Sequence, residues 1–244
     1  MEALTSADVI VGYTTYIDLI RPLIGEKDVI STPMKKEVAR VEAAIERALE
    51  GKTCAIVSSG DAGIYAMAGL VFEMCRIKKI PILSTRDEPE EESLERGLQI
   101  EVVPGIPALC SGASLLGAPL MHDFAAISLS DLLTPWDVIE RRLEAAAKAD
   151  FVIVLYNPKS RKRDWQLEAA RKIILRWRKK ETPVGIVGRA MREGQTIQIV
   201  PLEQLSKAPV DMQTTVFIGN SKTFTFHDFM VTPRGYAEKY AMDR

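Results

Sequence analysis

Short apolar runs without charged residues recur along the chain, and stretches with helical periodicity separate them. Three such runs are VIVGY at 9–13, CAIVSS at 54–59 and FVIVLY at 151–156. The stretch at 36–50 repeats apolar residues at helical spacing, on the face formed by Val38, Val41, Ile45, Ala48 and Leu49. A run that is apolar at every position is typical of a strand buried on both faces. The alternation therefore predicts an α/β fold with a largely parallel sheet between helices.

The last part of the chain has a different pattern. TIQIV at 196–200 alternates in the antiparallel manner, and TTVFIG at 214–219 and FMVT at 229–232 follow with little helix between. We therefore predict a mostly parallel N-terminal sheet and a mixed C-terminal sheet, in α/β domains at 1–112 and 113–244. Further predicted elements are helices at 64–76, 136–147 and 164–177 and strands at 98–103, 124–130 and 183–188.

Composition excludes several classes of protein. The 244 residues are 47% hydrophobic, and 32 Lys and Arg against 33 Asp and Glu leave a net charge of −1. Such a chain is not disordered, and it is a poor candidate for wholesale binding to nucleic acid or to a membrane surface. Three cysteines and two histidines favour a cytoplasmic protein without a disulfide framework or a zinc site. The stretch 102–121 is uncharged, but its glycines and prolines favour a buried loop and helix over a membrane span.

Four loops rich in glycine or proline follow the predicted strands. Ligands of open α/β sheets collect at the carboxyl ends of strands, so these loops are the best candidates for a binding site. None has the dinucleotide fingerprint or a Walker A sequence, and a nucleophilic triad lacks its GxSxG turn. Together they predict a ligand cleft built mainly from backbone. The loops are SSGDAGIYAMAGL at 58–70, VVPGIPA at 102–108, LYNP at 155–158 and GIVGRAMREG at 185–194.

Each loop also has a purely structural interpretation. Asp61 is a candidate N-cap for the helix that follows it, a role that does not exclude a nearby ligand. Gly105 allows either a positive φ or a close approach of two backbones. Asn157 before a proline favours a turn. These alternatives stay open at the level of the sequence.

The loop at 58–70 resembles the GD-x-x-Y segment of the tetrapyrrole methylases, which bind S-adenosylmethionine (SAM). Further segments are similar to the branch of that family that methylates C17 of precorrin-3B or cobalt-factor III and contracts the macrocycle in cobalamin biosynthesis. The resemblance extends from Ala7 to Tyr236. Its segments are VGYTTYIDLI, VVPGIPA, LGAPLMHDFAAISLSDLLTPWDVIERRLEAAAKADFVIVLYNPKS, TTVFIGNS and MVTPRGY.

The resemblance implies two α/β domains with SAM and the macrocycle in the cleft between them, in a homodimer without nucleic acid, membrane or metal. Carried over motif by motif, it implies a cofactor site made by Gly60, Asp61, Tyr65, Pro107, Ala108, Tyr156, Asn157, Gly185, Thr214 and Thr215. One departure concerns the start of the chain. Met1 falls inside the helix before VIVGY, so the first strand of the family and its glycine-rich loop are expected to be missing.

A basic run at 159–180 holds ten basic residues against Asp164 and Glu168. It is either a solvated helix face or a region that attracts a polyanion. Because the macrocycle carries acetate and propionate groups, we expect Lys159, Arg161 or Arg163 to bind them. His122 is the candidate for moving a proton during ring contraction.

Three other functions remain possible at this level. A methyltransferase of the same fold that acts on RNA or protein would need a broader basic or open surface. A catalytically silent corrinoid-binding module would fit a missing first strand. An NAD-linked oxidoreductase ranks last, because its glycine fingerprint is absent.

Overall fold

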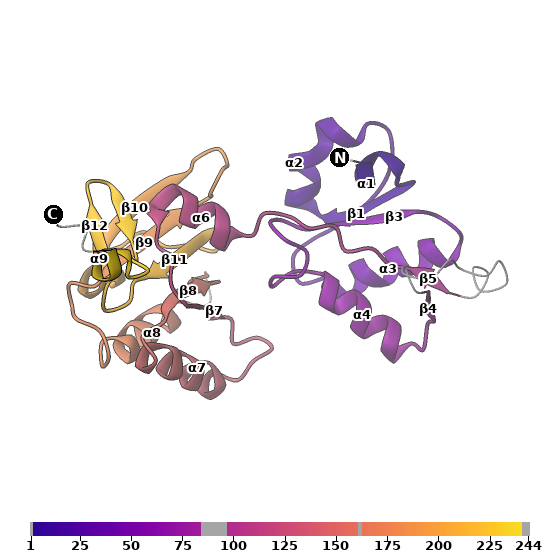
Figure 1. Cartoon of the computed structure of the whole chain (residues 1–244). Helices are drawn as coiled ribbons and strands as arrows, with labels where there is room; N and C mark the ends of the chain where they lie inside the picture. Colours follow the sequence, from indigo (N-terminus) through magenta and orange to yellow (C-terminus); the bar gives the residue numbers. More distant parts are fainter. Residues whose placement is uncertain (1, 84–96, 161–162, 241–244) are drawn as a thin grey trace. The chain divides into compact units, whose positions relative to one another are not determined.

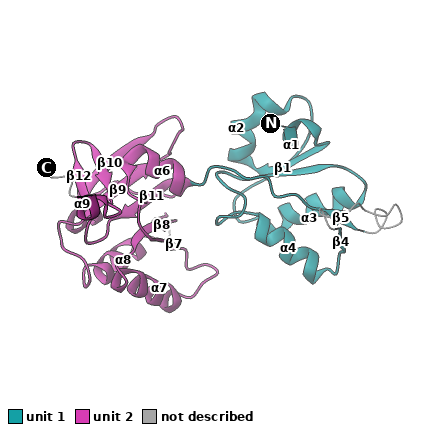
Figure 2. Cartoon of the chain, viewed as in Figure 1, with its two compact units in different colours: residues 1–107 teal, residues 108–244 magenta. Residues whose placement is uncertain are grey.

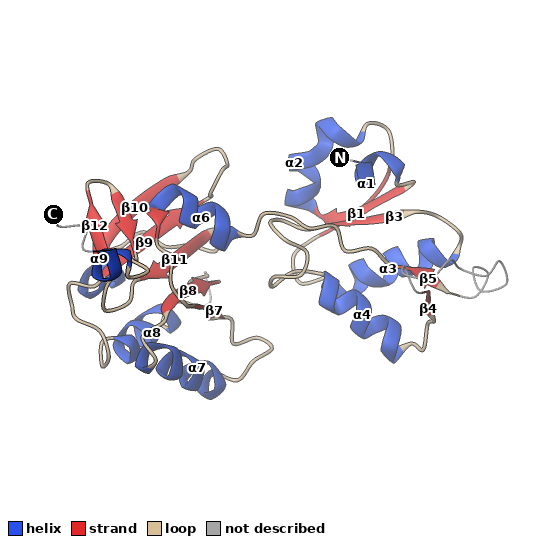
Figure 3. Ribbon diagram, viewed as in Figure 1, coloured by secondary structure: helices blue, strands red, loops and turns tan. Residues whose placement is uncertain are grey.

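The computed structural model of the chain describes residues 2–83, 97–160 and 163–240 (Figure 1). It divides into two compact units, unit 1 at residues 1–107 and unit 2 at residues 108–244 (Figure 2). Each unit combines helices with strands (Figure 3). Unit 2 begins with helix α6 (Ala108–Leu116), and the predicted domain boundary after residue 112 falls inside this helix.

Unit 1 is built around a parallel sheet in the order β2-β1-β3, and β4 pairs with β5 beside it. A helix precedes β1, as the resemblance implies. The elements are α1 (Glu2–Ser6), β1 (Val9–Tyr13), α2 (Thr14–Ile24), β2 (Asp28–Thr32), α3 (Glu37–Leu49), β3 (Cys54–Val57), α4 (Ala68–Ile77), β4 (Ile82–Leu83) and β5 (Leu98–Gln99).

Helices cover both faces of this sheet, as the apolar runs predict. Successive side chains of a strand point to opposite faces. In β1, Ile10 accordingly packs with Ile17 of α2, whereas Val9 and Val11 pack with Ala44 of α3. The prediction of a buried parallel sheet in the N-terminal half is therefore confirmed.

Two predictions for unit 1 are wrong in detail. Val38 and Leu49, assigned to the buried face of α3, are 58% and 55% exposed, because they lie in its first and last turns while the middle of the helix packs on the sheet. The helix predicted from residue 64 begins only at Ala68, since Tyr65 has a left-handed φ of 52° that no α-helix contains.

The strand predicted at 98–103 is also shorter than expected. Within the part of the chain that the structure describes, Leu98 and Gln99 pair with Ile82 and Leu83 of β4, and residues 100–107 form no regular element. Pro104 and Pro107, which lack a backbone N–H, favour an irregular backbone over residues 104–107 as well. This segment is therefore a loop that leads from β5 to α6.

Unit 2 contains a mixed sheet in the order β10-β9-β11-β8-β7 and a smaller sheet in the order β12-β13-β6. This confirms the predicted mixed C-terminal sheet. After α6 the elements are β6 (Gly117–Ala118), β7 (Phe124–Ser128), α7 (Trp136–Lys148), β8 (Val152–Tyr156), α8 (Gln166–Ile174), β9 (Pro183–Gly188), β10 (Thr196–Pro201), the 3₁₀ helix η1 (Leu202–Lys207), β11 (Thr214–Ile218), β12 (Phe224–Phe226), β13 (Phe229–Val231) and α9 (Tyr236–Tyr240).

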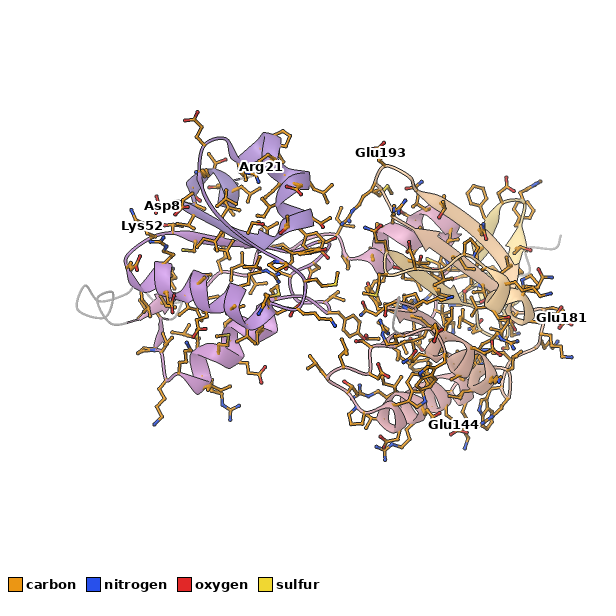
Figure 4. The ribbon with its side chains drawn as sticks, turned by 180° about the vertical axis from the view of Figure 1, so that it is seen from behind. Asp8, Arg21, Lys52, Glu144, Glu181 and Glu193 are labelled. Carbon is orange, nitrogen blue, oxygen red and sulfur yellow. The ribbon has the colours of Figure 1, made fainter. Side chains whose placement is uncertain are left out.

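Three strands of the larger sheet, β7, β8 and β9, end at the same edge. β7 runs parallel to β8, and both β8 and β9 run antiparallel to β11. The ends of β7, β8 and β9, at Ser128, Tyr156 and Gly188, therefore lie at one edge, where β11 begins at Thr214. We call this edge of unit 2 the carboxyl edge. Figure 4 labels Glu193 and Glu181 on opposite sides of the unit. Glu193 lies just beyond the carboxyl end of β9, and Glu181 precedes the amino end of that strand.

The main core of unit 2 lies between this sheet and helices α7 and α8. Helix α6 covers the opposite face. There the glycines permit close packing: a Cβ on Gly185 of β9 would lie 2.3 Å from Leu116, and one on Gly112 would lie 2.7 Å from Phe217 of β11. The small residues in these apolar segments are thus explained by a helix packed directly on the sheet.

Candidate active site

The loop after β3 is held in place by Asp61. One oxygen of its carboxylate, Oδ1, accepts the backbone N–H of Gly63 at 2.8 Å, and Oδ2 accepts that of Gly105 at 3.0 Å. The bond from Gly105, followed by the one from Gly63, lowers the pKa of the Asp61 carboxyl below its ordinary value. Asp61 is not the N-cap of α4, because that helix begins seven residues later, at Ala68. It joins two of the predicted ligand loops.

Gly105 decides how closely these two loops approach. A Cβ at this position would lie 2.0 Å from the carbonyl oxygen of Gly60. No side chain fits in that space, so the glycine serves a close contact between backbones and not a positive φ. Gly60 itself has a φ of 78°, which only glycine adopts at low cost.

Tyr65 has an unusual backbone in the same loop. Its φ of 52° lies in the left-handed region, which aromatic residues rarely adopt, and its side chain is 53% exposed. Strained backbone of this kind concentrates at functional sites. Unit 1 thus joins the loop of Gly60, Asp61 and Tyr65, which the resemblance assigned to the cofactor, to Gly105, two residues before Pro107.

At the carboxyl edge of unit 2, Tyr156 lies beside the start of α6. Its hydroxyl oxygen accepts the N–H of Leu109 at 2.8 Å, one of the helix N-terminal donors that lack an intrahelical partner. This bond places Tyr156 next to Ala108, which also fits the predicted grouping. Since Val216 pairs with Leu155, Thr215 is the neighbour of Tyr156 on the adjacent strand.

Asn157 continues this edge with a left-handed φ of 51°. Its side-chain amide donates to Ser128 Oγ at 3.0 Å and so joins the ends of β7 and β8. Thr214 is 5% exposed, and its hydroxyl donates to Asp211 Oδ1 at 2.9 Å. Gly185 differs from the others, because Leu116 covers its face of the sheet and gives the glycine a packing role.

Arg163, predicted to bind the substrate, does not fit that role. It is 6% exposed, and its Nη1 donates to the carbonyls of Leu129 at 2.8 Å and Asn157 at 2.6 Å. Burial lowers the pKa of its guanidinium, and the nearby carboxylate of Asp131 partly offsets this. Arg163 therefore supports the loops of the carboxyl edge from inside. The periodicity of the sequence did not show that this basic residue points inward.

The other members of the basic run have different surroundings. Lys159 is exposed, and Arg161 lies outside the described residues. Arg171 pairs with Glu168 at 2.7 Å, and the buried guanidinium of Arg178 donates to the carbonyl of Phe151 at 3.0 Å. The run is consequently not one continuous basic surface.

His122 lies at the other edge of the sheet. It precedes the first residue of β7, whereas Tyr156 is the last residue of β8, which runs parallel to β7, and Asn157 follows it. Five residues of strand separate the two edges by about 17 Å. His122 instead lines a cavity of about 380 Å³ with Phe151 and Arg234. The structure therefore does not support a role for His122 beside these cofactor candidates.

Sequence reasoning overlooked Arg189, which directly follows β9. It lies in the glycine-containing loop predicted at 185–194, and its place directly after Gly188 is the sequence signal that points to it. Arg189 has a left-handed φ of 49°, and its Nε donates to Gln213 Oε1 at 2.7 Å. It lines an open cavity of about 310 Å³ at the carboxyl edge.

The described residues also bear on a membrane span and on a metal site. No helix within 2–83, 97–160 or 163–240 has the length and apolar character needed to cross a bilayer. The uncharged stretch 102–121 forms a loop, α6 and β6. Nor do three His, Cys, Asp or Glu side chains gather as metal ligands in this part of the chain.

Comparison with known proteins relates this architecture to one family. The family model of the tetrapyrrole (corrin/porphyrin) methylases matches residues 1–206. The chain is 47% identical over 243 residues to a cobalt-factor III methyltransferase of Priestia megaterium, covering 100% of this chain but 43% of the relative. It is 45% identical over 236 residues to a probable cobalt-factor III C(17)-methyltransferase of Salmonella typhimurium, covering 97% of this chain and 91% of the relative.

Among solved structures, the methyltransferase CobJ matches with a TM-score of 0.82 and 34% identity, over 95% of this chain and 91% of that one. The chain thus spans less than half of the Priestia relative and nearly all of the Salmonella one. These matches confirm the fold and the family that the sequence motifs predicted. The chain belongs to the tetrapyrrole (corrin/porphyrin) methylases.

Proposed function

We propose that this chain methylates C17 of cobalt-factor III or precorrin-3B, with ring contraction, in the biosynthesis of the corrin ring of cobalamin. As a member of its family it is a methyltransferase with SAM as methyl donor, as the sequence predicted. The names of the Priestia and Salmonella relatives support the choice of macrocycle. The observation that carries the proposal is the junction of Asp61, Gly60 and Gly105, where backbone groups of two loops are held together.

The residues of unit 1 fit a donor that is bound mainly by backbone. The space that a Cβ of Gly105 would fill is closed by Gly60, and the Asp61 carboxylate is used to hold the loops. We infer that backbone groups of Gly60 and the ring of Tyr65 bind the donor, while Asp61 positions them. Pro107, the last residue of unit 1, and Ala108, the first residue of α6, would contact the donor as well.

Unit 2 would contribute its carboxyl edge. We infer that Tyr156, Asn157 and Thr215 contact the donor there, and that Thr214 and Gly185 support this edge through the Asp211 bond and the packing of α6. SAM supplies an electrophilic methyl group, and transfer disperses the positive charge of its sulfonium. The protein then has to align the reactants and exclude water, which needs no covalent nucleophile.

We also propose a homodimer that acts in the cytoplasm on a small molecule, without nucleic acid. The support is chemical: Cys54, Cys75 and Cys110 are free thiols, which suits a reducing compartment, and the net charge is close to zero. Sedimentation of the purified chain tests the dimer, and a monomer at micromolar concentration contradicts it.

The central test incubates the purified chain with SAM and either cobalt-factor III or precorrin-3B, and follows the macrocycle by mass spectrometry. The expected product gains one methyl group, and S-adenosylhomocysteine forms in equal amount. Binding of SAM is measured in parallel by calorimetry. A chain that binds the macrocycle but gives no heat with SAM and no methylated product would refute the proposed activity.

A further inference from the structure

We propose that Arg189 binds a carboxylate of the macrocyclic substrate, in the open cavity at the carboxyl edge of unit 2. The inference rests on the proposed function, because that macrocycle carries several acetate and propionate groups. It replaces Arg163, whose guanidinium is occupied inside the protein.

The guanidinium of Arg189 is held in one orientation. Its Nε donates to Gln213 Oε1 at 2.7 Å, and its backbone N–H donates to the carbonyl of the same residue at 3.0 Å. Gly194 has a φ of 74°, and a Cβ on it would lie 3.0 Å from Nη1 of Arg189. The arginine head group thus lies against the backbone of Gly194, with its Nε already bonded to Gln213.

Both terminal nitrogens of Arg189 are available. Among the residues that the structure describes, neither Nη1 nor Nη2 has a hydrogen-bond or ion-pair partner. A guanidinium presents a planar pair of donors that matches a carboxylate in two parallel bonds. An arginine fixed at Nε and unpaired at both terminal nitrogens therefore fits this ligand group.

The cavity provides room for a side chain of the macrocycle. Its volume is about 310 Å³, and its lining includes Gly188, Gly194, Thr196, Asp211 and Thr214. Asp211 is the one acidic residue of this lining, and its Oδ1 already accepts the N–H of Gln213 and the hydroxyl of Thr214. These two donors reduce the repulsion that the carboxylate exerts on an incoming anion.

The cavity also lies beside residues assigned to the methyl donor. Gly188 pairs with Thr214 at the start of β11, and Thr215 follows on the opposite face of the strand. A carboxylate bound to Arg189 would therefore orient the macrocycle at the same edge of the sheet. SAM also carries a carboxylate, so the test has to distinguish the two ligands.

The test compares Arg189→Gln with Arg141→Gln, which removes the same charge from an exposed position on α7. Affinity for cobalt-factor III is measured from its visible absorbance, and affinity for SAM by calorimetry. Loss of a charge-assisted pair predicts a fall of about 10- to 100-fold in macrocycle affinity for Arg189→Gln, with SAM affinity within twofold of wild type. The Michaelis constant for the macrocycle should rise while kcat changes little.

A second variant, Gln213→Ala, removes the acceptor that orients Arg189 and should weaken macrocycle binding less. In the Arg189→Gln background it should have no further effect. Macrocycle affinity of Arg189→Gln within twofold of Arg141→Gln, or an equal loss of SAM affinity, would overturn the inference while the proposed function stands. Failure of the wild-type chain to bind and methylate cobalt-factor III would overturn both.

Discussion

Replacing Gly105 by alanine tests the close contact between the two loops of unit 1. The new Cβ would lie 2.0 Å from the Gly60 carbonyl oxygen and 3.3 Å from Asp61 Cα, and both are backbone atoms that cannot rotate away. Since ordinary contacts begin near 3.4 Å, one loop has to move by roughly 1.4 Å to admit the methyl group. Forced backbone shifts of this kind cost about 1–3 kcal/mol of folding free energy.

The displacement should affect function more than stability. It separates the Gly105 N–H from Asp61 Oδ2, now 3.0 Å apart, and moves the backbone groups proposed to bind SAM. A misplacement of about 1 Å at a site of this kind can cost about 100-fold in rate. We therefore expect Gly105→Ala to lower kcat/KM for methyl transfer by about 100-fold and to weaken SAM binding in calorimetry.

The matched control is Gly69→Ala on α4 in the same unit. A Cβ there meets no atom within 4 Å, and alanine favours a helix, so stability should stay level or rise by up to about 1 kcal/mol. Thermal unfolding and SAM affinity are measured for both variants. If Gly105→Ala binds SAM and turns over within twofold of Gly69→Ala, the loop junction is not part of the donor site.

Three further predictions concern the same framework. The Gly105 N–H is the main cause of the lowered pKa of Asp61. The hydrogen bonds to the Asp61 carboxylate are therefore complete above the ordinary carboxyl pKa near 3.8, and they are lost as the pH falls through the lower pKa of the folded state. NMR titration of the Gly105 amide should accordingly show no transition between pH 5 and 8. Gly185→Ala should destabilise the chain by about 1–3 kcal/mol in chemical denaturation, because its Cβ would lie 2.3 Å from Leu116, and Leu116→Ala should relieve part of this loss. Arg163→Met should cost about 2 kcal/mol through the lost carbonyl bonds without changing macrocycle affinity once folded, and a selective loss of that affinity would restore its predicted binding role.

Local patterns were sufficient to predict most strands of the fold. Runs such as 9–13 and 151–156 are short, rich in Val and Ile, and apolar at every position, which is typical of a strand covered on both faces. Helix ends were predicted less well. Tyr65 lies in an apparently helical stretch, but the bonds of Asp61 to Gly63 and Gly105 hold the preceding loop and delay the helix to Ala68.

The sequence by itself determined the α/β alternation, the change to a mixed sheet and the glycine-containing loops at the strand ends, because these depend on residues close together in the chain. Only the tertiary structure decided which charges are available. Arg163 turns inward onto carbonyls, His122 lies at the far edge of its sheet, and Arg189 keeps its terminal nitrogens unpaired within the described residues. Those outcomes depend on strand direction and on partners 24 to 34 residues away, which no local pattern contains.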